Sequence, residues 1–228
     1  MFFYAQKLIQ FLLFGILVSQ VLAAPTLSND DSTISKRDNT PFEISMDEHT
    51  NLGMWMGQAK SRGHPYFPSQ TWTGQKLKDN MILAAKRGYE DIKSQNGGQN
   101  PPVIVAALHV PSYGIFMATS PQKAIILSEA QKTAPIWWNK AGKDKKTSKD
   151  LHAEDGAMWF SEYRGKFEGH NEMFPQGSFI AAYGRYGPDS GKPDARNPCG
   201  DDTTSNVPCR TTLSELGISS VLSDENEC

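Results

Sequence analysis

The 228-residue chain has a formal net charge of −2 and an isoelectric point near 6.2, with 38% hydrophobic and 21% charged residues. This near-neutral balance argues against a protein that captures nucleic acid through broad positive charge, so any nucleic-acid contact must be local. There is no internal repeat and no Asn-x-Ser/Thr sequon free of proline, so N-glycosylation is not expected.

The N-terminus has the pattern of a secretory signal peptide over residues 1–23. Lys7 precedes an apolar run from Leu8 to Val18, and the small residues Ala23 and Ala24 follow. The run is too short to span a bilayer, so we expect cleavage after about Ala23 or Ala24 and no membrane segment in the mature chain.

A polar segment, residues 24–37, follows and ends in the dibasic pair Lys36-Arg37. Its composition supports no core, and the pair predicts a propeptide removed by a kexin-type protease, which leaves a secreted mature protein. The remaining chain of roughly 190 residues fits one domain with a sizeable core. We predict an N-terminal extension over 38–73 and a main domain over 74–228, with an insertion at about 120–150.

The main domain alternates helical and strand patterns, and an eight-residue run of strand formers precedes a Pro-Ser-Tyr-Gly turn. The predicted elements are a helix over 74–93, strands over 103–110 and 115–119, a short helix at 124–131, a helix over 152–164, a strand within 177–186, a helix over 209–216 and a short strand at 218–222. This order predicts an α/β sandwich.

Three cysteines are present: Cys199, Cys209 and Cys228. In an oxidising compartment the default is disulfide pairing, but an odd number leaves one thiol over whichever pair forms. The segment Gly200 to Pro208 separates the first two cysteines, and its polar composition is compatible with a disulfide-closed loop. Three states of Cys228 remain open: a free thiol, a disulfide between two chains, or a disulfide with Cys199 or Cys209.

Two short motifs stand in a specific order along the main domain. His152-Ala153-Glu154 begins a predicted helix, and Pro198-Cys199 and Pro208-Cys209 follow the next predicted strand. This arrangement resembles the zinc-dependent cytidine deaminase-like superfamily, and it is most similar to the toxin-type and fungal secreted members. The resemblance implies a three-layer α-β-α sandwich with a small mixed sheet, and hydrolysis of an amino group from the base of a nucleoside, nucleotide or nucleic acid.

The resemblance also implies roles for single residues. His152, Cys199 and Cys209 would hold Zn²⁺, whose fourth position stays open for a water of lowered pKa. A helix starting at Cys209 would help keep that sulfur a thiolate. Glu154 would act as the general acid and base without binding the metal. The chain departs from the superfamily in the cysteine spacing, which is usually Cys-x-x-Cys.

Two other functions remain open. The first is a non-catalytic secreted interaction protein or effector, with the same fold and a Cys199–Cys209 disulfide. The second is a metal-independent secreted ribonuclease that uses side chains such as His152, Glu154 and Arg185.

The insertion offers the candidate substrate-binding residues. Trp137 and Trp138 could stack on a base, and the lysines that follow them could meet phosphate. Such a surface would fit a nucleobase-containing small molecule or a nucleic acid. The alternative is that the tryptophans anchor the insertion to the core beside a solvated run of charge.

Overall fold

The computed structural model describes residues 42–49, 53–68, 72–95, 104–121, 128–145, 150–167, 172–185, 192–198 and 209–220. The predicted signal peptide and propeptide, Cys199 and Cys228 lie outside these residues. Every described residue belongs to one compact unit that runs from Thr40 to Cys228. No helix among the described residues combines the length and the apolar character that a bilayer crossing requires.

The centre of this unit is a seven-stranded, mostly antiparallel sheet. Its strands are β1 (Glu48–His49), β2 (Trp55–Gln58), β5 (Ile104–Val110), β6 (Gly114–Thr119), β7 (Phe179–Gly184), β8 (Asp194–Arg196) and β9 (Ser219–Ser220). The order is β1-β2-β6-β5-β7-β8, and β9 pairs in parallel with the first part of β7. A separate pair is formed by β3 (Lys60–Ser61) and β4 (His64–Pro65). The sheet is mixed, as predicted, but larger than predicted.

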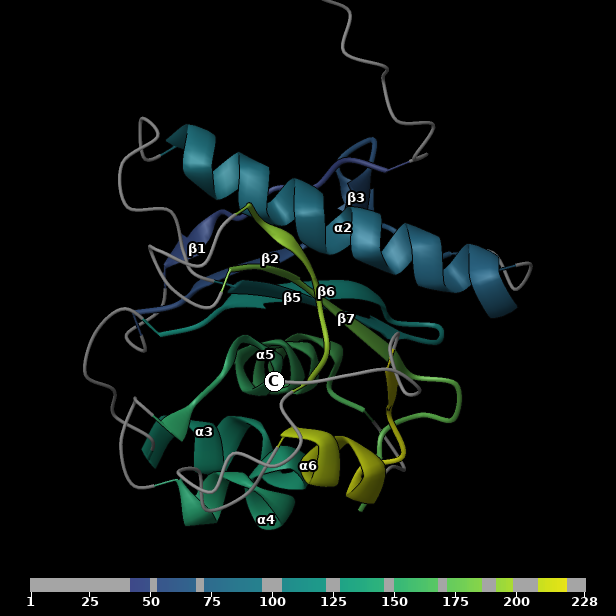
Figure 1. Cartoon of the computed structure of the whole chain (residues 1–228). Coiled ribbons are helices and arrows are strands. Elements are labelled where there is room, and N and C mark those ends of the chain that lie inside the picture. The colour runs from purple at the N-terminus through teal and green to yellow at the C-terminus, as the bar shows by residue number, and fades with distance from the viewer. Residues whose placement is uncertain are drawn as a thin grey trace, which may run out of the picture. The chain divides into compact units, whose positions relative to one another are not determined.

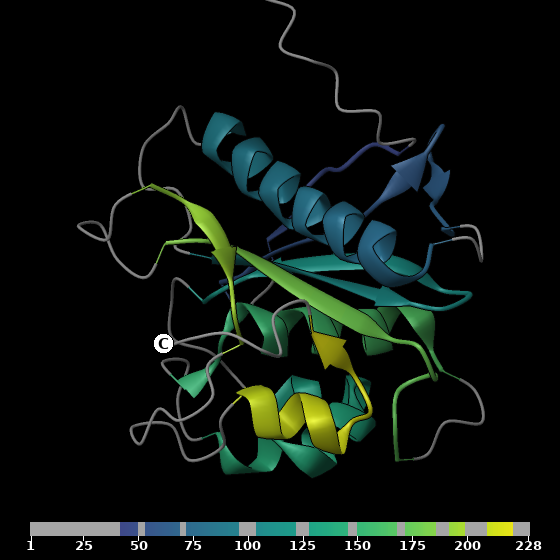
Figure 2. The same ribbon diagram turned by 45° about the vertical axis from the view of Figure 1, so that its right-hand side comes forward.

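Helices cover both faces of the sheet (Figure 1). They are α2 (Gly74–Gln95), α3 (Ser128–Thr133), α4 (Pro135–Lys140), the 3₁₀ helix η1 (Gly142–Asp144), α5 (Ala153–Gly165) and α6 (Cys209–Glu215). Helix α2 packs on one face against β5 and β7, and α5 packs on the other face against β5 and β6. Figure 2 shows α6, in yellow, on the α5 side of the sheet. The predicted α/β class is confirmed.

The central strands divide their side chains between two cores. On β5, Val105 and Ala107 belong to the core beneath α2, whereas Ala106 and Leu108 belong to the core beneath α5. Successive side chains of a strand point to opposite faces, and both faces are covered here. For this reason the strand reads as a continuous apolar run rather than as an alternating one.

The turn between β5 and β6 requires a glycine at its end. Gly114 has φ +114°, and a Cβ there would lie 2.7 Å from the backbone oxygen of Tyr66. The Tyr113 N–H donates to the carbonyl of Val110 and closes the turn. The predicted hairpin is therefore formed, with Val110 opposite Gly114.

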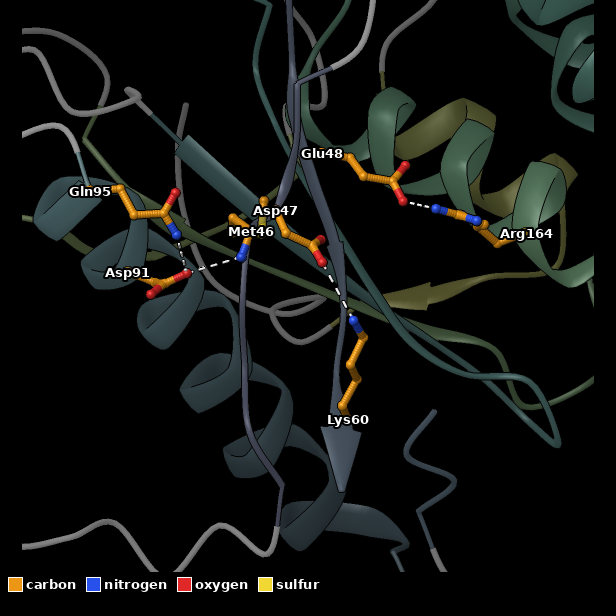
Figure 3. Close-up of polar contacts among 7 residues, drawn as sticks. All are labelled: Met46, Asp47, Glu48, Lys60, Asp91, Gln95 and Arg164. Atoms are coloured by element: carbon orange, nitrogen blue, oxygen red, sulfur yellow. Dashed lines mark hydrogen bonds and ion pairs between the residues drawn. The ribbon is translucent and has the colours of Figure 1, made fainter. Parts of the chain in front are cut away.

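The segment predicted as an N-terminal extension supplies β1 and β2 to the sheet, beside β6. Two polar contacts tie it to the rest of the unit, and they join Met46 to Asp91 of α2 and Glu48 to Arg164 of α5 (Figure 3). A third contact joins Asp47 to Lys60 of β3 within the segment. Met46 is fully buried, and its N–H donates to Asp91 Oδ2 at 2.9 Å. This segment is therefore part of the folded domain.

Candidate metal centre

The start of helix α5 fixes the backbone of His152. His152 is the N-cap, with extended dihedrals of φ −105° and ψ 173°. Its backbone N–H donates to Asp155 Oδ2 at 2.9 Å. Asp155 is the third residue of the helix, and a carboxylate there that accepts the N-cap N–H forms one half of a capping box. Asp155 therefore fixes the backbone of His152 at the helix start.

The side chains of His152 and Cys209 meet across a large sequence separation. His152 Nδ1 lies 2.9 Å from Cys209 Sγ, although the two residues are 57 positions apart. Cys209 is the first residue of α6 and is buried. A tetrahedral zinc ion with usual Zn–N and Zn–S bond lengths holds such atoms about 3.5 Å apart, so the pair would open by roughly half an ångström around a metal.

Asp155 completes a group that could hold a metal ion. One ligand atom each from His152, Asp155 and Cys209 lies within 4.8 Å of the other two. The oxygens of Asp155 are already engaged, however. Oδ2 also pairs with Lys145 Nζ at 3.3 Å, and Oδ1 accepts from Trp137 Nε1 at 3.1 Å. Asp155 could bind a metal only by giving up some of these contacts.

A buried hydroxyl lies on the same helix as Cys209. Thr212 is fully buried, and its Oγ1 has no hydrogen-bond partner in the described part of the chain. It stands three residues after Cys209 on α6, and residues at this spacing share a helix face. Unpaired buried polar atoms are costly, so a native one calls for an explanation such as a missing ion or water.

The other predicted site residues have different surroundings. Glu154 lies in the first turn of α5 and is buried, with 5% of its surface exposed. Cys199 follows Pro198, the last described residue before α6, so the structure does not describe the predicted third ligand. Arg185 directly follows β7 and is half-buried.

The two tryptophans of the insertion differ in exposure. Trp137 is buried, with 1% of its surface exposed, in the core beneath α5. Trp138 is half-buried and packs edge-on against Trp137, with ring centroids 6.4 Å apart. The burial of Trp137 supports the alternative that this side chain anchors the insertion to the core. Lys145, one of the lysines interpreted as solvated, is instead buried as the partner of Asp155.

A second buried carboxylate connects the insertion to α5. Both oxygens of Glu162 accept backbone N–H groups of α4, from Ile136 at 2.6 Å and from Trp137 at 3.0 Å. Burial raises the pKa of Glu162 to about 7, although these two hydrogen bonds act in the opposite direction. Glu162 also lines a cavity of about 580 Å³ between α3, α4 and the end of α5, which shares no residue with the metal group.

The structure thus brings together two of the three predicted metal ligands, His152 and Cys209, and adds Asp155. Sequence reasoning missed Asp155, although its place three residues after a helix N-cap is a recognisable capping signal. The chain matches no model of a known protein family, and no curated protein and no solved structure is significantly similar to it.

Proposed function

We propose that this protein is a secreted zinc-dependent hydrolytic deaminase that acts on a nucleobase in a nucleoside, nucleotide or nucleic acid. The observation that carries the proposal is the 2.9 Å approach of His152 Nδ1 to Cys209 Sγ. The two atoms come from the starts of two different helices, and the sequence motifs predict a metal ligand at each position.

The order of elements supports the same proposal. The resemblance implies a helix, a hairpin, a helix that starts with His-x-Glu, a strand followed by Pro-Cys, and a second cysteine at the next helix. Helix α2, strands β5 and β6, helix α5, strand β7 and helix α6 follow one another in this order, with β8 added between β7 and α6. His152 precedes α5 by one residue, and Cys209 is the first residue of α6.

The donor set favours zinc among the common protein metals. An imidazole nitrogen and a thiolate sulfur are borderline and soft ligands, which suit zinc, whereas magnesium and calcium require oxygen. We assign the third ligand to Cys199, because both oxygens of Asp155 are engaged in buried contacts. Bound zinc would supply a nucleophilic water near neutral pH.

Glu154 is the proposed general acid and base. Its carboxylate would take a proton from the attacking water and pass it to the ring nitrogen of the base. A second proton, from the hydroxyl formed by the attack, would leave with the amino group as ammonia, so that the ring keeps a carbonyl oxygen. Glu154 is buried, so these transfers would take place away from bulk water.

The test is a deamination screen of the purified mature chain. Nucleosides, nucleotides, single-stranded DNA and RNA that carry cytosine, adenine or guanine are incubated with the protein, and ammonia and the altered base are quantified. Glu154→Gln should keep the zinc and lose activity by roughly 10²- to 10⁴-fold. Glu162→Gln changes another buried carboxylate of the same helix and should keep the activity.

Two results would contradict the proposal. The first is a Cys199–Cys209 disulfide in the purified protein, found by peptide mapping, because it would remove both sulfur ligands. The second is RNA cleavage that survives a chelator and depends on His152 and Arg185, which would identify the ribonuclease alternative instead.

A further inference from the structure

We infer that Asp155 is a positioning residue for the metal ligand His152, and that the insertion before α5 supports the metal site through it. This inference rests on the proposed function, because it requires a metal at His152 and Cys209. It assigns to Asp155 a role other than that of a ligand, although its carboxylate lies within 4.8 Å of both ligand atoms.

The contacts of Asp155 account for both of its oxygens. Three donors converge on them: the His152 backbone N–H, the Lys145 ammonium and the Trp137 indole N–H. The carboxylate is buried, with 1% of its side chain exposed, and so is the Lys145 side chain, with 2% exposed. A buried carboxylate with a neutralising cation and satisfied oxygens gains little by moving to a metal, because the buried ion pair with Lys145 would be broken.

The same contacts explain how Asp155 acts on His152. The N–H of His152 is fixed by Oδ2, so the backbone that carries the imidazole cannot rotate freely at the helix start. Lys145 and Trp137 hold the carboxylate from the other side. Groups behind a metal ligand that set its orientation commonly change metal affinity by 10- to 100-fold when they are removed.

This network gives the insertion a function. Trp137 belongs to α4, and Lys145 directly follows η1, so two of the three donors to Asp155 come from the segment predicted as an insertion. A separate contact, between Glu162 and the backbone of α4, also docks the insertion on α5. Glu162 lies ten positions after His152 and accepts the backbone N–H of Trp137, so Glu162→Gln weakens the docking of α4 without removing a donor to Asp155.

The experiment measures zinc affinity of the mature chain by chelator competition. The principal variant is Lys145→Gln/Asp155→Asn, which removes both charges of this buried ion pair together. Trp137→Phe is a second variant that keeps an aromatic ring, although a smaller one, and removes the indole N–H that donates to Asp155. We expect the double variant to bind zinc 10- to 100-fold more weakly and Trp137→Phe several-fold more weakly. Glu162→Gln should stay within about twofold of the wild type, although it lowers the melting temperature of the metal-free protein at acidic pH, where the Glu162 carboxyl is protonated.

A cobalt-loaded sample shows whether the ligands themselves have changed. If Asp155 only positions His152, the thiolate-to-cobalt charge-transfer and ligand-field bands of Trp137→Phe and the double variant keep the wild-type shape. A spectrum that shows loss of an oxygen ligand overturns the inference, as does an affinity loss in Glu162→Gln equal to that in the Asp155 variant. No loss in any Asp155-contact variant overturns it too. A wild-type chain that binds neither zinc nor cobalt overturns the proposed function as well, so the two failures are distinguishable.

Discussion

Glu162 is expected to make the stability of the fold depend on pH. Its carboxylate is buried and accepts the backbone N–H groups of Ile136 and Trp137. Burial raises its pKa from 4.5 to about 7, so the folded protein binds a proton that the unfolded chain releases over this interval. The informative change is Glu162→Gln, which keeps the shape of the side chain and removes the titration.

The sign and the size follow from proton linkage. Because the folded-state pKa is raised, this contribution to stability is fully present below pH 4.5 and is lost as the pH rises towards and past 7. The two pKa values together predict a loss of about 2 to 3 kcal/mol between pH 5 and pH 8. The glutamine offers one acceptor oxygen for two N–H groups, so it costs an additional amount of about 1 to 3 kcal/mol that does not depend on pH.

The assay is urea unfolding at several pH values, followed by tryptophan fluorescence, for the wild type and Glu162→Gln. The difference between the two free energies of unfolding isolates Glu162, because the other titrating groups are common to both proteins. We expect the stability of the wild type relative to the variant to fall as the pH rises. Parallel curves across this range would contradict this prediction, because they would show that the α4 N–H groups compensate the charge of Glu162 fully.

Two further substitutions test the packing of the fold. Burial lowers the pKa of His109 to about 4, and its Nδ1 has no hydrogen-bond partner among the described residues. The wild type should therefore lose roughly 3 kcal/mol of unfolding free energy between pH 7 and pH 4, and His109→Leu should not. Equal acid sensitivity of both proteins in urea unfolding would contradict this. Gly156→Ala should destabilise the protein by about 1 to 3 kcal/mol, because the added Cβ would contact the Met54 side chain and lie 2.9 Å from Ala118 Cβ. A stabilised variant, the usual result at an exposed helix position, would show that α5 can move away from β6.

The regular elements of the main domain were predictable because local patterns define them. The apolar run of β5, the turn before Gly114 and the long helix α2 each carry a signal within a few neighbouring residues. The two ligand residues His152 and Cys209 were identified through short motifs at element starts, and the structure places them in contact distance.

The remaining features depend on contacts between distant segments. Strands β1 to β4 and β8 are two to four residues long, too short for a period-2 pattern, and they exist because neighbouring chain pairs with them. The burial of Lys145 could not be predicted either. In sequence it belongs to a lysine-rich run, and only the fold brings Asp155 to its ammonium group.

The most direct test of the metal site is the zinc-to-protein ratio of the purified mature chain, measured by elemental mass spectrometry together with a count of reactive thiols in denaturant. The account predicts about one zinc per chain, lost in His152→Ala and in Cys209→Ala, with Cys199 and Cys209 reactive after the metal is removed. A metal-free chain in which Cys199 and Cys209 form a disulfide would contradict it.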